Sequence, residues 1–98
     1  MDKEKILEDV LKIIRDLTRD FDTDLSGGLG PQTHIVEDIG FESIDSVELI
    51  IALETHYQRR DLPFQELVMR EGRYHDFTIQ DIVDFLFKHL TTPKESSL

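Results

Sequence analysis

One stretch, from Phe41 to Leu62, constrains the fold of this chain more than any other. It contains neither proline nor glycine, and its apolar residues recur three and four positions apart, which is the spacing of a helix. Gly40 interrupts the chain directly before it. We therefore expect a helix from about Ser43 to Arg59 that leaves the Ser43 hydroxyl accessible at its N-terminal end.

Two apolar stripes run along this predicted helix, although a surface helix normally has one. The first stripe is expected to face a core and comprises Ser46, Leu49, Ile50, Leu53 and Tyr57. The second comprises Ile44, Val47 and Ile51, and it is flanked by the carboxylates of Asp45, Glu48 and Glu54. Periodicity leaves two interpretations of the second stripe open: additional core, or an exposed docking surface for a partner with basic side chains.

The rest of the chain predicts three further helices. Residues 3–19 have the pattern of an amphipathic helix, and residues 64–71 that of a short helix ending at Gly72. Thr78 and Asp81 have the spacing of a capping box that begins the last helix. No segment alternates with the period of a strand. We therefore expect an all-α fold: a small four-helix bundle of three longer helices plus one short third helix, with a long first loop.

The chain has 98 residues, which is enough for one small domain. We assign residues 1–90 to this domain, and we expect the polar tail 91–98 to be disordered. Residues 20–40 are expected to form the long loop and residues 72–77 a linker, because glycine or proline interrupts the pattern there.

The formal net charge of −10, from 11 basic and 21 acidic side chains, argues against nucleic acid and anionic membranes as partners and favours basic proteins. The chain has no cysteine, so any thiol chemistry needs an added group. The first residues lack the apolar run of a signal peptide, and no apolar stretch approaches the length of a membrane span. We therefore expect a cytoplasmic, monomeric protein without membrane insertion.

Residues 37–54, EDIGFESIDSVELIIALE, resemble the recognition segment of acyl carrier proteins. In that family a glycine and the residues Asp-Ser-Leu precede an acidic, aliphatic helix. Gly40 matches the glycine and Ser43 the serine that carries 4′-phosphopantetheine. The chain departs from the pattern at Glu42, where the family has aspartate, and at Ile44, where it has leucine. Both replacements keep the charge or the apolar character.

The resemblance implies a free-standing acyl carrier protein that catalyses no reaction itself. Ser43 would receive 4′-phosphopantetheine from coenzyme A through a phosphopantetheinyl transferase, and the arm would hold acyl groups as thioesters. Partners would be acyl-loading and acyl-transfer enzymes, such as a ketosynthase or acyltransferase, in fatty acid, polyketide or lipid-acylation pathways. The partner-binding residues would be Glu42, Ile44, Asp45, Val47, Glu48, Ile51 and Glu54. The expected lining of an acyl pocket is Leu49, Leu53, Phe64 and Leu67.

Other functions remain open at this point. An aminoacyl or peptidyl carrier would use the same arm, and a non-carrier adaptor would use the acidic helix alone, with Ser43 only as a helix cap. A Ser-His-Asp hydrolase is disfavoured, because the sequence around Ser43 is G-F-E-S-I and lacks the G-x-S-x-G elbow. We expect no metal site, since Asp20, Asp22 and Asp24 begin a calcium-loop pattern that fails at Leu25 and Pro31.

Overall fold

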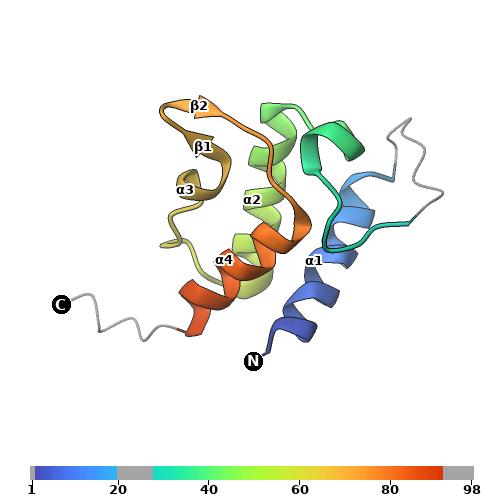
Figure 1. The fold of residues 1–98 in the computed structure, drawn as a ribbon. Coiled ribbons are helices and arrows are strands. Elements are labelled where there is room, and N and C mark those ends of the chain that lie inside the picture. Colours follow the sequence, from blue (N-terminus) through green and yellow to red (C-terminus); the bar gives the residue numbers. More distant parts are fainter. Residues whose placement is uncertain (1, 20–27, 92–98) are drawn as a thin grey trace.

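A computed structural model describes residues 2–19 and 28–91 of the chain. Within these residues it contains five helical segments and one two-stranded sheet, a mostly helical small domain (Figure 1). In chain order the elements are α1 (Lys3–Leu17), η1 (Ile35–Ile39), α2 (Ser43–Tyr57), α3 (Gln65–Val68), β1 (Met69–Arg70), β2 (Arg73–Tyr74) and α4 (Ile79–Thr91).

Helix α1 begins and ends where its side chains satisfy the backbone. The carboxylate of Asp2 accepts a hydrogen bond from the Lys5 N–H, which caps the first turn. At the other end, the Thr18 hydroxyl and N–H both donate to the Ile14 carbonyl. The helix ends at Leu17, two residues before the predicted end at residue 19. Three residues of its apolar stripe, Ile6, Val10 and Ile14, are fully buried.

Helix α4 starts at the predicted capping box. The Asp81 N–H donates to the Thr78 hydroxyl over 3.0 Å, and the Asp81 carboxylate accepts from the Thr78 N–H over 2.9 Å. Two backbone hydrogen bonds, from Ile35 N–H to the Phe77 carbonyl and from Ile79 N–H to the Thr33 carbonyl, join this start to the segment before η1. The chain that leads to Ser43 is therefore tied to the beginning of α4.

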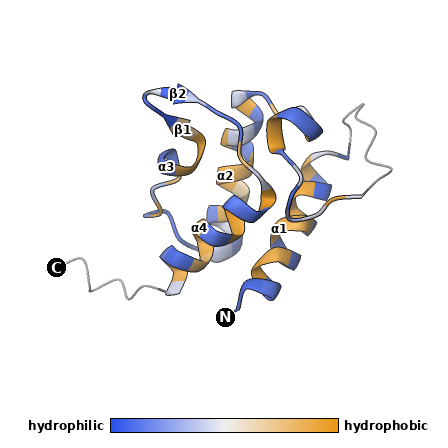
Figure 2. Cartoon of the chain, viewed as in Figure 1, coloured by the Kyte–Doolittle hydropathy of each residue, from blue (hydrophilic) through white to orange (hydrophobic). Residues whose placement is uncertain are grey.

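In the described part of the chain, the helices enclose one apolar core. Helix α1 packs against both α4 and α2, and α4 also contacts α3. Figure 2 shows that α1 and α4 carry apolar residues on the sides that face the interior. The core residues of η1, α2 and α4 are Ile35, Ile39, Leu49, Leu53, Ile79, Ile82, Val83 and Leu86, all of them at most 2% exposed.

The region between α2 and α4 differs from the expectation in two ways. The short third helix spans only Gln65–Val68, and Met69–Arg70, which were predicted to belong to that helix, form strand β1 instead. Strand β1 pairs with β2, which lies in the predicted linker 72–77, so the described chain is not purely helical. Glu71 and Gly72 connect the strands with φ values of 53° and 76°. Positive φ at both central residues is the mark of a type I′ turn, which favours a tight two-residue hairpin.

Several predictions concern residues outside the described part of the chain. These are the aspartates at positions 20, 22 and 24, the first part of the long first loop (residues 20–27), and the tail apart from Thr91, which ends α4.

Among the residues that the structure describes, no helix has both the length and the apolar composition to span a membrane.

Candidate functional site

Ser43 is the first residue of α2, and its side chain is exposed. Gly40, with a φ of 91°, ends η1 in a left-handed conformation, and the chain then turns into the new helix. The Asp45 carboxylate accepts a 2.8 Å hydrogen bond from the Glu42 N–H, which fixes the start of the helix. Ser43 therefore presents its hydroxyl at the positive end of a 15-residue helix dipole.

The two stripes of α2 have different environments. On the first stripe, Ser46, Leu49 and Leu53 are at most 2% exposed, while Ile50 and Tyr57 are half-buried. On the second stripe, Ile44, Val47 and Ile51 are 60%, 48% and 55% exposed. Among the described residues, these three and Met69 are the exposed large apolar side chains. The interpretation of the second stripe as additional core is therefore wrong.

Carboxylates surround the exposed stripe. Glu42 and Glu48 are exposed, and Asp45 and Glu54 are partly buried.

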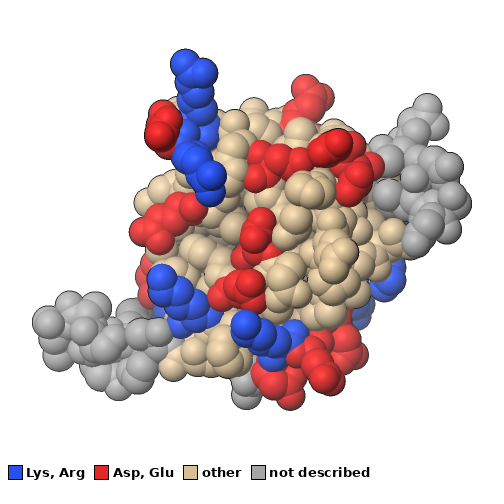
Figure 3. All heavy atoms as spheres, in the orientation of Figure 1, with Lys and Arg blue, Asp and Glu red and all other residues tan. Residues whose placement is uncertain are grey.

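Met69 lies on β1, next to Arg70, and Arg73 pairs with Arg70 across the hairpin. Both arginines are exposed, and basic atoms project in Figure 3 from the corner where Figure 1 shows the hairpin. The hairpin therefore places two exposed arginines beside Met69.

The predicted acyl-pocket residues do not share one environment. Leu49, Leu53 and Phe64 belong to the buried core, and half-buried Leu67 packs against it. Leu67 also lines an outer cleft of about 280 Å³ between α3, the hairpin and α4, together with Phe85, Arg70 and His75. Three of the four residues predicted to line the acyl pocket therefore lie in the core, and only Leu67 lines the cleft.

Tyr74 on β2 reaches the first turn of α2. Its hydroxyl shares a 2.6 Å hydrogen bond with the buried hydroxyl of Ser46, and it donates a longer one, of 3.5 Å, to the Glu42 carbonyl. Burial, followed by the nearby carboxylates of Asp76 and Asp45, raises the pKa of Tyr74 despite the bond to Ser46. The phenol therefore keeps its proton at neutral pH. Its two hydrogen bonds attach the hairpin to α2, the helix that carries Ser43.

Asp76 holds the segment before Ser43 in place. Its carboxylate accepts hydrogen bonds from the backbone N–H groups of Val36, Glu37 and Phe77, at 2.8, 3.2 and 2.8 Å. Burial by itself raises the pKa of Asp76, but these bonds and the neighbouring His34 lower it overall. Asp76 thus caps η1 from a loop 40 residues further along the chain.

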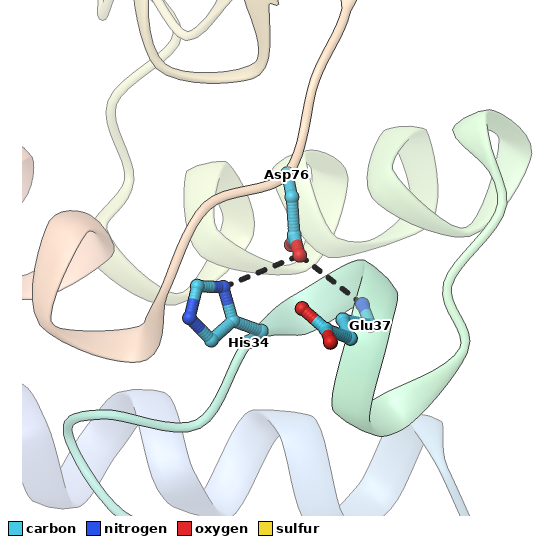
Figure 4. A group of neighbouring side chains, drawn as sticks. All are labelled: His34, Glu37 and Asp76. Carbon is cyan, nitrogen blue, oxygen red and sulfur yellow. Dashed lines mark hydrogen bonds and ion pairs between the residues drawn. The ribbon is translucent and has the colours of Figure 1, made fainter.

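His34, Glu37 and Asp76 place one potential metal-ligand atom each within 4.8 Å of one another (Figure 4). The buried Nδ1 of His34 lies 3.2 Å from the Asp76 carboxylate, close enough for an ion pair when the imidazole is protonated but not aligned as a hydrogen bond. Three backbone N–H groups already point at Asp76, and their positive ends disfavour a cation there. We therefore interpret this group as a structural contact.

Two histidines lie in contacts that do not involve Ser43. His34 faces Asp76, and His56 lies 3.3 Å from the Asp9 carboxylate. His56 is in the last turn of α2, about 20 Å along the helix axis from Ser43. These positions do not assemble a Ser-His-Asp arrangement from Ser43, His34 or His56.

Sequence reasoning missed Tyr74 and Asp76 as neighbours of the site. The residues Glu71 and Gly72 were the one local signal for the hairpin, and Glu-Gly is weaker than Asn-Gly or Asp-Gly as a turn signal. Asp76 and Val36 are 40 residues apart, and no local pattern relates residues at that distance.

No protein-family model matches the chain, and neither a curated protein nor a solved structure matches it.

Proposed function

We propose that this protein is a free-standing acyl carrier. In this proposal Ser43 bears a 4′-phosphopantetheine arm, the arm holds acyl intermediates as thioesters, and the protein presents them to biosynthetic enzymes without catalysing a reaction itself. The observation that carries the proposal is the combination at the start of α2: an exposed serine as the first helical residue, followed by an exposed aliphatic stripe with carboxylates beside it.

The surroundings of Ser43 suit a phosphodiester. The helix dipole stabilises a negative group at the N-terminus, and the exposed hydroxyl leaves room for a transferase active site. In the transfer step, a bond from Ser43 Oγ to phosphorus forms, and the bond from that phosphorus to the nucleotide part of coenzyme A breaks. The serine proton leaves to a base, and the nucleotide is the leaving group. The arm supplies the thiol that this cysteine-free chain lacks.

The docking surface supports partners with basic faces. Ile44, Val47 and Ile51 offer apolar contact area, and the exposed carboxylates of Glu42 and Glu48 attract positive charge. In this proposal the partners are a phosphopantetheinyl transferase and acyl-handling enzymes such as a ketosynthase or an acyltransferase. The pathway would be fatty acid synthesis, polyketide synthesis or lipid acylation.

The proposal includes a finer description of the fold and the setting. We place α1, α2, α4 and the short α3 in the four-helix arrangement of acyl carriers, with the β1–β2 hairpin as an addition between α3 and α4. The packing of α1 against α2 and α4, and of α3 against α4, supports this assignment. We also propose that the protein works as a monomer in the cytoplasm.

The test is the intact mass after incubation with coenzyme A and a promiscuous phosphopantetheinyl transferase. We expect the wild type to gain one phosphopantetheine unit and Ser43→Ala to gain none. A matched control is Thr55→Ala, which removes another exposed hydroxyl from the same helix and should leave the gain intact. Circular dichroism on each variant verifies that the protein is folded.

A folded wild type whose mass does not change would contradict the carrier proposal. That result would favour a helical adaptor that binds a basic protein through α2, with Ser43 acting only at the helix start. A gain in mass followed by loading with amino acids in place of simple acyl groups would indicate an aminoacyl or peptidyl carrier.

A further inference from the structure

The hydroxyl of Tyr74 contacts the first turn of α2 on both sides of Ser43 in the sequence. It contacts the Glu42 carbonyl, which belongs to the residue directly before Ser43, and it shares its 2.6 Å hydrogen bond with Ser46, three residues after Ser43. Ser46 is 2% exposed and Tyr74 is half-buried, so this bond is made at the edge of the core. We call this arrangement the Ser46–Tyr74 contact.

Apolar residues continue from the Ser46–Tyr74 contact into the core. Ser46, Leu49 and Leu53 lie three and four residues apart on the buried face of α2, so Ser46 forms the end of this row that is nearest to Ser43. Phe64 belongs to the same buried cluster. A flexible chain attached at Ser43 that entered the core along this face would meet the two hydroxyls first.

We infer that Tyr74 is a specificity-determining residue, whose hydrogen bond with Ser46 sets the shortest acyl chain that leaves solvent and enters the core beside α2. The inference rests on the proposed carrier function. Short acyl groups would stay in solvent on the arm, and only chains with enough methylene groups would separate the two hydroxyls and become buried.

The expected shift in chain length follows from comparing the free energy of burying one methylene group with that of one hydrogen bond. Burying one methylene group shifts an equilibrium by about fourfold, and a typical hydrogen bond in a protein shifts one by about two- to tenfold. Removing the Ser46–Tyr74 bond should therefore be equivalent to about one or two methylene groups of the acyl chain. Burial also keeps the pKa of Tyr74 raised, so the contact persists across the neutral pH range.

The experiment loads Ser43 with acyl groups from acetyl to decanoyl in steps of one carbon, using the acyl-coenzyme A compounds and a promiscuous transferase. The rate at which hydroxylamine cleaves each thioester reports whether the acyl group is sheltered. We expect Tyr74→Phe and Ser46→Ala to show protection at a chain length about one or two carbons shorter than the wild type. The acetyl thioester should react at the same rate in all variants.

The matched control is Tyr57→Phe. Tyr57 donates its hydroxyl to the Asp9 carboxylate over 3.0 Å, which joins the far end of α2 to α1. This control removes the same atom from the only other tyrosine of the chain. Its protection profile should match that of the wild type, although its stability falls. A merely structural role of Tyr74 would lower stability without moving the chain length at which protection begins.

Each result decides the inference. A profile that is the same in wild type, Tyr74→Phe and Ser46→Ala would overturn it, whether the chains are all sheltered or all exposed. The two variants remove the same bond from opposite sides, so one of them suffices if the other does not fold. Failure of the carrier proposal is recognised earlier and separately, because the mass of the protein would then not change in the loading step.

Discussion

Single carboxylates organise the starts of the helices in this protein. Asp2 caps α1, Asp45 caps α2, Asp81 caps α4, and Asp76 caps η1 from a distant loop. Each of them lies at the positive end of a helix, where a negative charge is favourable. Part of the excess negative charge is therefore explained by the fold. Asp45 in particular already accepts a hydrogen bond at the start of α2, whether or not a partner binds.

Asp76 provides a direct test at the residue scale. We expect Asp76→Asn to lower the free energy of unfolding at pH 7 by about 1–2 kcal/mol, because an amide cannot accept all three N–H bonds as strongly as a carboxylate. The pKa of Asp76 is lower in the folded state, so the carboxylate stabilises the fold above about pH 4. This contribution is lost as the pH falls through the folded pKa, and the difference between variant and wild type should shrink.

Urea unfolding at pH 7, 5, 4 and 3 measures the Asp76 effect. The control is Asp16→Asn, because Asp16 lies in an exposed pair with Arg19 and such a pair contributes about 0–1 kcal/mol. A difference between Asp76→Asn and wild type that stayed constant over the whole pH range would show that the charge of Asp76 is not what stabilises η1.

Glu48 separates the docking role from the structural one. Its side chain is exposed beside Val47 and is not at the helix start, so we expect Glu48→Lys to leave the thermal stability equal to that of the wild type or slightly above it, since the variant carries less excess negative charge. The association rate with the phosphopantetheinyl transferase should fall by about three- to tenfold at low salt, because reversed charge repels a basic partner. Stopped-flow measurements between low and physiological salt check this, and the difference should shrink as salt is added. An unchanged rate at low salt would count against docking through this face of α2.

At the scale of the elements, the parts that sequence periodicity predicted are those held by local interactions. The starts of α2 and α4 follow from Gly40 and from the Thr78–Asp81 capping box, both of which act within a few residues. The β1–β2 hairpin was missed because its strands have two residues each, which is too short for a period to show. Its position on α2 depends on the Ser46–Tyr74 hydrogen bond, between residues 28 apart, so it is a product of tertiary packing.

The hairpin turn carries a residue that does not suit its conformation. Glu71 has a φ of 53°, a left-handed value that favours glycine and asparagine over glutamate. We expect Glu71→Asn to raise the free energy of unfolding by about 0.5–1 kcal/mol, because Asn-Gly is the preferred pair in a type I′ turn. Chemical denaturation measures the change. The same replacement at Glu48, inside α2, should be slightly destabilising, since asparagine is a poorer helix former than glutamate. Loss of stability in Glu71→Asn would mean that the turn is not type I′ in solution.

At the scale of the whole molecule, the candidate site combines a predictable part and an unpredictable part. Ser43 and the two stripes of α2 follow from the helix period, although only the structure shows which stripe is exposed. The contacts that position this helix end come from residues 74 and 76, and they depend on how the segment before α4 packs against η1 and the residues that precede it. Local sequence therefore predicts an accessible serine at the start of a helix, and tertiary packing decides that Tyr74 and Asp76 lie near that helix start.

The net charge of −10 leads to a prediction for the molecule as a whole. Exposed ion pairs such as Lys3–Asp84 stabilise the fold weakly, whereas mutual repulsion of the excess carboxylates destabilises it. Raising the salt from about 0.01 M to about 0.15 M shortens the screening length from about 30 Å to about 8 Å, which weakens the long-range repulsion more than the close pairs. We therefore expect sodium chloride to raise the Tm at pH 7 by a few degrees.

The pH dependence of this salt effect identifies its cause. Near the isoelectric point of about 4.6 the net charge vanishes, so the rise in Tm with salt should largely disappear there. Calorimetry or circular dichroism at both pH values measures the effect, with sodium chloride kept below the concentrations at which salts act on apolar surface. A Tm that fell with salt at pH 7 would show that attractive pairs outweigh the excess charge. In that case the carboxylates of this protein would be matched within the fold, and fewer of them would be available to attract a basic partner.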